Sequence, residues 1–82
     1  MSIEAIRATT AQVRDQIVAA HQDVRTARDR LTDAVRTLTD LSRNHSVSLV
    51  PPEHRRADDQ LADCLEKLVG CLACLDSYVA GL

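Results

Sequence analysis

The chain has 82 residues, of which 45% are hydrophobic and 1% aromatic, and its formal net charge is −2 at pH 7. This length allows a single domain, and the lone aromatic residue, Tyr78, excludes a stacking platform for single-stranded nucleic acid. A charge this small gives no reason to expect DNA or a membrane surface as a partner.

The sequence carries no targeting signal that we recognise. The first ten residues, MSIEAIRATT, include Glu4 and lack the apolar core of a signal peptide, and no run approaches the roughly 18 apolar residues of a membrane span. Three cysteines are an odd number for a secreted disulfide framework. We therefore expect reduced thiols and a cytoplasmic location, with signal-independent secretion as the alternative.

The first segment predicts an α-helix over residues 3–44. Apolar residues recur every seven positions along two lines, which we assign to the a and d positions of a coiled-coil seam. The a line is Ile3, Thr10, Ile17, Val24, Leu31 and Leu38, and the d line is Ile6, Val13, Ala20, Ala27, Ala34 and Leu41. Ser2 is suited to the N-cap, and Glu4 to the first turn.

Residues 45–51 predict a loop, because Val50 precedes a proline and is pushed toward extended geometry. A second helix is expected over residues 52–80, with another heptad seam. Its seam residues are Leu61, Leu65, Leu68, Leu72, Leu75, Val79 and Leu82, and a side line comprises Ala57, Cys64, Cys71 and Tyr78. The expected fold is all-α: residues 1–82 form one antiparallel, coiled-coil-like hairpin.

Three cysteines lie within CLEKLVGCLAC, residues 64–74. Cys71 and Cys74 form a C-x-x-C, but they lie in the middle of a helix rather than at its N-terminus, where the helix dipole activates a thiol. A zinc site needs about four ligands, and a second ligand pair is missing. We expect buried or half-buried structural thiols, with no metal and no cofactor. A thiol-based metal or redox sensor, or an intermolecular disulfide, is the alternative.

Basic residues offer a second candidate site. Arg7, Arg14, His21 and Arg28 form a stripe at heptad spacing. Such a stripe can contact phosphate, or it can flank the seam beside an acidic helix. We favour the second interpretation because the residues from 57 onward carry five acidic residues against one lysine. His45 and His54, on either side of the loop, are expected to be solvated or to cap helix ends.

Catalytic chemistry has no support in the sequence. It lacks a nucleophile elbow, a phosphate-binding loop and a dinucleotide fingerprint, and a two-helix unit should be too thin for a ligand cavity. We expect no enzymatic activity. The expected function is a structural or protein–protein interaction module that acts through coiled-coil-type association.

The short loop suggests a register for the hairpin, with Leu38 near Leu61, Leu31 near Leu68 and Val24 near Leu75. In that register the N-terminal part of the first helix extends beyond the second helix and stays uncovered. We expect that this part is covered in a homodimer that forms a four-helix bundle, or by pairing with another helical protein. The expected interface residues are Ile3, Ile6, Val13, Ile17, Val18, Val35, Cys64, Val69 and Cys71.

The pattern of two helices in a short chain resembles the small helical-hairpin proteins exported by type VII secretion systems, the Trp-X-Gly family. The resemblance covers the whole chain and rests on its helical pattern: the loop reads SVSLVPP in place of Trp-X-Gly, and the tail reads YVAGL. It implies a four-helix bundle of two hairpins and a role as a secreted substrate or its partner. The Arg, Ala, Asp and Val usage also resembles that of hairpin proteins from actinobacteria.

Overall fold

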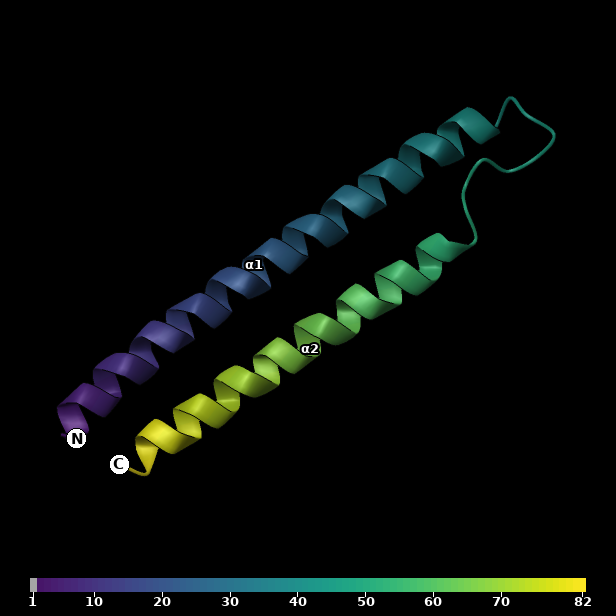
Figure 1. Ribbon diagram of the computed structural model, residues 1–82. Coiled ribbons are helices and arrows are strands. Elements are labelled where there is room, and N and C mark those ends of the chain that lie inside the picture. Colours follow the sequence, from purple (N-terminus) through teal and green to yellow (C-terminus); the bar gives the residue numbers. More distant parts are fainter. Residues whose placement is uncertain (1) are drawn as a thin grey trace.

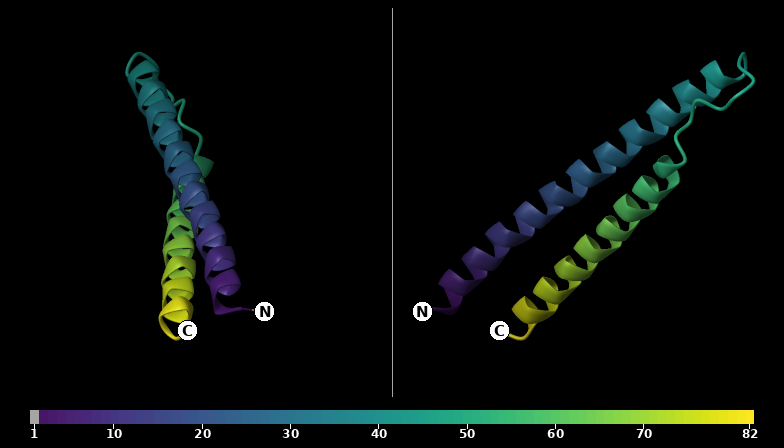
Figure 2. Two further views of the ribbon diagram at one scale, coloured as in Figure 1. Left: turned by 90° about the vertical axis from the view of Figure 1, so that its left-hand side faces the viewer. Right: turned by 45° about the vertical axis from the view of Figure 1, so that its right-hand side comes forward.

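The computed structural model describes residues 2–82, which form two α-helices, α1 (Ile3–Ser42) and α2 (Glu53–Ala80). The helices lie antiparallel and side by side in a rod of 66 × 15 × 14 Å, with the two termini at the same end (Figures 1 and 2). The predicted all-helical hairpin is confirmed. Helix α1 ends two residues earlier than expected, and α2 begins one residue later.

The helix ends follow from local chemistry. The backbone N–H of Ala5 donates to Ser2 Oγ at 3.1 Å, so Ser2 is the N-cap of α1 as predicted. Pro52 occupies the N-cap of α2 without a side-chain cap. The connection between the helices folds back toward α1, because the N–H of Leu49 donates to Ser42 Oγ at 2.7 Å.

The predicted register is wrong. It would place Arg28 beside Cys71, but the Arg28 side chain reaches Asp58 at 2.8 Å, and Arg14 reaches Asp76 at 3.0 Å. The prediction assumed that the loop brings the ends of the two helices to the same level. The connection instead passes the end of α1 and returns before α2 begins (Figure 1).

The expected N-terminal overhang is therefore also wrong. The last turns of α2 lie beside the first turns of α1, where Thr10 and Val79 line one groove. Ile6 is half-buried rather than uncovered, and the N- and C-termini lie close together (Figure 1). The part of α1 that extends beyond α2 is its C-terminal end, next to the connection.

The seam of α2 is the predicted one except for Leu82, which is exposed beyond the end of the helix, but the seam of α1 is rotated. In α2 the half-buried line includes Leu61, Leu65, Leu68, Leu72, Leu75 and Val79. In α1 the predicted a line from Thr10 to Leu38 is half-buried, together with a line four residues later: His21, Arg28, Val35 and Ser42. The predicted d positions Val13, Ala20, Ala27, Ala34 and Leu41 are exposed. This rotation brings Arg28 and Val35 toward α2, and the alanines, which have little surface to bury, move out of the seam.

A two-helix seam encloses very little. Among residues 2–82 no residue is buried, and every seam residue keeps part of its surface in water. The exposed surface is 6329 Å², whereas a compact monomer of 9.0 kDa exposes about 4,900 Å². The hairpin has a packed seam but no enclosed core.

Gly70 gives a test of the α2 assignment. It lies inside α2, and a Cβ atom added there would meet nothing within 4 Å. Because alanine restricts the unfolded backbone more than glycine, Gly70→Ala should raise the free energy of unfolding by about 0.5–1 kcal/mol. Urea unfolding followed by circular dichroism would measure it. A loss of stability would mean that position 70 is packed or is not helical.

Candidate interaction surface

The two long faces of the hairpin differ, and the first is marked by ion pairs. Arg14 and Arg28 extend from α1 to Asp76 and Asp58 of α2, so both ion pairs cross the seam. Val18 lies one turn after Arg14, and Val69 lies seven residues before Asp76, so these two valines share the same side. We call this side the ion-pair face.

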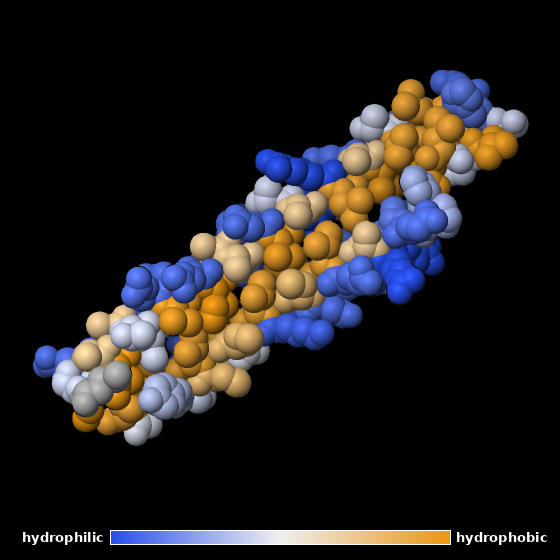
Figure 3. Space-filling model, in the orientation of Figure 1, coloured by the Kyte–Doolittle hydropathy of each residue, from blue (hydrophilic) through white to orange (hydrophobic). Residues whose placement is uncertain are grey.

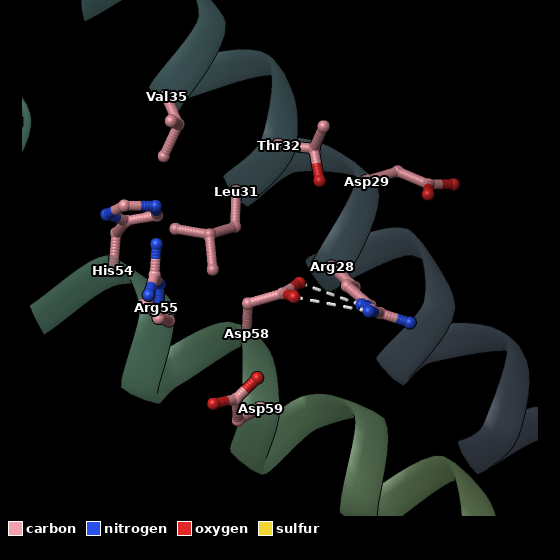
Figure 4. Close-up of a pocket in the computed structure, with 9 residues that line it drawn as sticks. All are labelled: Arg28, Asp29, Leu31, Thr32, Val35, His54, Arg55, Asp58 and Asp59. Atoms are coloured by element: carbon pink, nitrogen blue, oxygen red, sulfur yellow. Dashed lines mark hydrogen bonds and ion pairs between the residues drawn. The ribbon is translucent and has the colours of Figure 1, made fainter.

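The Arg28–Asp58 pair is bidentate. Arg28 Nε donates to Asp58 Oδ1 at 2.8 Å, and Nη2 donates to Oδ2 at 3.2 Å (Figure 4). These hydrogen bonds from Arg28 lower the pKa of Asp58 below its ordinary value of 3.8, against the opposing effect of partial burial. The same contact raises the pKa of Arg28, and the hydrogen bond to Asp76 raises that of Arg14. Both pairs keep much of their surface in water, so they contribute little to the total stability.

The ion-pair face contains an open groove of about 580 Å³ at the start of α2, although we expected so thin a unit to leave no room for a cavity. Figure 4 shows its lining: Arg28, Asp29, Leu31, Thr32, Val35, His54, Arg55, Asp58 and Asp59. Three acidic residues offset the basic ones, and His54 Nδ1 is already 3.0 Å from the carbonyl oxygen of Pro51. With His54 neutral, the lining carries three carboxylates against two guanidinium groups, and one of each is already joined in the Arg28–Asp58 pair.

The opposite side is apolar, and we call it the apolar face. On α1 it is formed by the d line, which is exposed except for the half-buried Ile6 and lies on the side of the seam away from Arg14 and Arg28. On α2 it is formed by the side line, which lies one turn before the seam residues Leu68, Leu75 and Leu82 and on the side of the helix away from Asp58. Its residues are Ile6, Val13, Ala20, Ala27, Ala34 and Leu41 of α1, and Ala57, Cys64, Cys71 and Tyr78 of α2.

Figure 3 shows this face as a nearly continuous hydrophobic band along the rod, bordered by hydrophilic residues. Figure 3 has the orientation of Figure 1, in which α1 runs upward from its N-terminus and α2 lies to its right. In Figure 4 α2 lies to the left of the rising α1, so the ion pairs are seen from the other side. The apolar band and the ion pairs therefore lie on opposite sides of the hairpin.

The predicted interface residues fall into three groups. Ile6, Val13, Cys64 and Cys71 lie on the apolar face, and Val18 and Val69 lie on the ion-pair face. Ile17 and Val35 are half-buried in the seam, and Ile3 is 53% exposed at the end of its seam line. Sequence reasoning missed Leu41 and Tyr78, both exposed, although the heptad spacing places them on the lines of Val13 and Cys71.

The cysteines do not form a cluster. All three are free; Cys64 is half-buried as expected, but Cys71 and Cys74 are exposed, so the expectation of burial is wrong for these two. Cys71 belongs to the side line of α2, and Cys74 lies beyond that line, so neither residue is one of the leucine positions that form the seam. Within residues 2–82, no group of three or more His, Cys, Asp or Glu side chains is placed to hold a metal ion.

Neither described helix has a stretch that is long and apolar enough to cross a membrane. Comparison with known protein families, with curated proteins and with solved structures found no match to this chain.

The Arg28–Asp58 pair predicts a pH dependence. Because the pKa of Asp58 is lower in the folded chain, the pair stabilises the fold above the ordinary carboxyl pKa of 3.8 and stops doing so as pH falls through the lower folded-state value. Asp58→Asn should remove this component. Urea unfolding between about pH 7 and pH 2 should show a smaller acid-induced loss of stability in Asp58→Asn than in the wild type.

The matched control is Asp63→Asn, which removes a carboxyl group from the same helix outside this ion pair. It should lose as much stability on acidification as the wild type. Equal acid sensitivity of Asp58→Asn and the wild type would show that the ion pair does not hold in solution.

Proposed function

We propose that this protein is a non-enzymatic interaction module, and that the apolar face associates with a second copy to form a homodimeric four-helix bundle. The main support is the absence of any buried side chain among residues 2–82. Helical hairpins with one apolar face commonly complete their core by pairing with another hairpin. The function is then carried by a surface rather than by a catalytic pocket.

The amount of exposed surface supports association. The hairpin exposes roughly 1,500 Å² more than a compact chain of its mass, and a stable interface buries about 800 Å² per partner. Covering one long face to this extent would remove about half of the excess. Each large apolar side chain that becomes fully buried contributes on the order of 1.5–3 kcal/mol.

The distribution of residues favours the apolar face over the ion-pair face. The apolar face has large side chains toward its ends, such as Val13, Tyr78 and Leu41, and small ones between them. Small residues let two helices approach closely, while the larger ones supply buried area. The ion-pair face would have to desolvate Arg14, Arg28 and their partners, which costs free energy.

Two valines on α1 give a matched test of this proposal. Val13 is 37% exposed on the apolar face, and Val18 is 44% exposed on the ion-pair face. Val13→Asp should convert the dimer to a monomer, because it buries a carboxylate in the interface. Val18→Asp, with the same change on the same helix, should leave the dimer intact. Light scattering coupled to size exclusion would give the masses.

Three results would contradict the proposal. One is a well-folded wild-type monomer at tens of micromolar, which would exclude the homodimer. Another is a dimer that survives Val13→Asp but not Val18→Asp, which would place the interface on the ion-pair face. The third is a dimer that neither substitution affects.

A further inference from the structure

Resting on the proposed homodimer, we propose that the two copies pair in parallel, with their termini at the same end. In this dimer, Asp23 of each copy lies beside Lys67 of the other. The two-fold axis runs along the rod, so α1 of each copy covers α2 of the other. The occupant of the apolar face is thus a second copy in one defined orientation.

Asp23 and Lys67 hold equivalent positions at the edges of the apolar face. Asp23 follows Ala20 by three residues and precedes Ala27 by four. Lys67 has the same relation to Cys64 and Cys71. Both side chains are exposed. Each therefore lies at the outer rim of the face, one on each helix, where a partner would bring its own rim into contact.

The two residues also lie at nearly the same level along the rod. Asp23 lies between Arg14 and Arg28 on α1, and Lys67 lies between their partners, Asp76 and Asp58, on α2. Interpolating between the two ion pairs places Asp23 and Lys67 within about one helical turn of each other. Each residue is also close to the middle of its own helix.

Two symmetric face-to-face dimers are geometrically available, and they differ in these charges. With the axis along the rod, Asp23 meets Lys67 of the second copy, and symmetry repeats this pair. With the axis across the middle of the rod, each helix meets its own copy, so Asp23 meets Asp23 and Lys67 meets Lys67. Opposite charges favour the first dimer, and like charges disfavour the second.

The rest of the rim agrees with the parallel dimer. By the same interpolation Gln16 lies level with Cys74 of the second copy, so two uncharged residues meet there. Along the face, the alanine line of α1 lies against the cysteines of the second copy, and Val13 lies near the second copy's Tyr78.

Charge reversal tests the arrangement. Asp23→Lys and Lys67→Asp should each weaken the dimer about tenfold, because two attractive pairs become repulsive. The double variant Asp23→Lys with Lys67→Asp restores both pairs with exchanged signs, so its dissociation constant should return close to that of the wild type. Sedimentation equilibrium would measure these constants, and circular dichroism would confirm that each variant remains helical.

The matched control is Glu66→Lys, which makes the same change in charge next to Lys67. Glu66 is seven residues after Asp59, which lines the ion-pair groove, so it lies on the other side of α2. Its substitution should leave the dissociation constant within about twofold of the wild type.

The outcomes separate the two proposals. A wild-type monomer would overturn both the homodimer and this arrangement. A wild-type dimer that neither single variant weakens would overturn the parallel arrangement alone. In the dimer whose axis runs across the rod, each charge reversal only replaces one like-charge pair by another. Single variants that weaken the dimer without recovery in the double variant would also overturn it.

Discussion

A pair of helices has only one seam, and this constraint governs the rest of the molecule. Each helix can turn one side toward the other, and its two flanks remain in water. Every seam side chain therefore stays partly exposed, and among residues 2–82 none is buried. Folding must offset about 1–2 kcal/mol of backbone entropy per residue, and this cost is the reason why we propose that the hairpin buries a further face by association.

The ion pairs distinguish the two faces of the hairpin. Arg14 and Arg28 reach across to Asp76 and Asp58, so both pairs lie on one side of the seam. Arg28 lies in the seam, and the alanine line of α1 lies outside it on the other side. One face therefore carries two cross-seam ion pairs, and the other carries the exposed alanine line. Exposed pairs of this kind contribute little free energy.

The sequence predicted the two helices closely, because a seven-residue repeat without glycine or proline in residues 3–45 is a strong local signal. It also predicted the leucine seam of α2 and the Ser2 cap. It did not predict the register, because the connection folds back through the contact between Leu49 and Ser42. Nor did it predict the rotation of α1, because the a/d repeat treats Ala20 and Ala27 as seam residues regardless of how little area they bury. Both depend on contacts between residues far apart in sequence.

The dependence of folding on association can be measured directly. The urea midpoint of helix unfolding should rise with chain concentration, because each tenfold increase stabilises a folded dimer by about 1.4 kcal/mol relative to two unfolded chains. We expect a clear increase across a hundredfold range of concentration. A cooperative transition whose midpoint is the same at every concentration would show that the hairpin is stable alone, and would contradict this account.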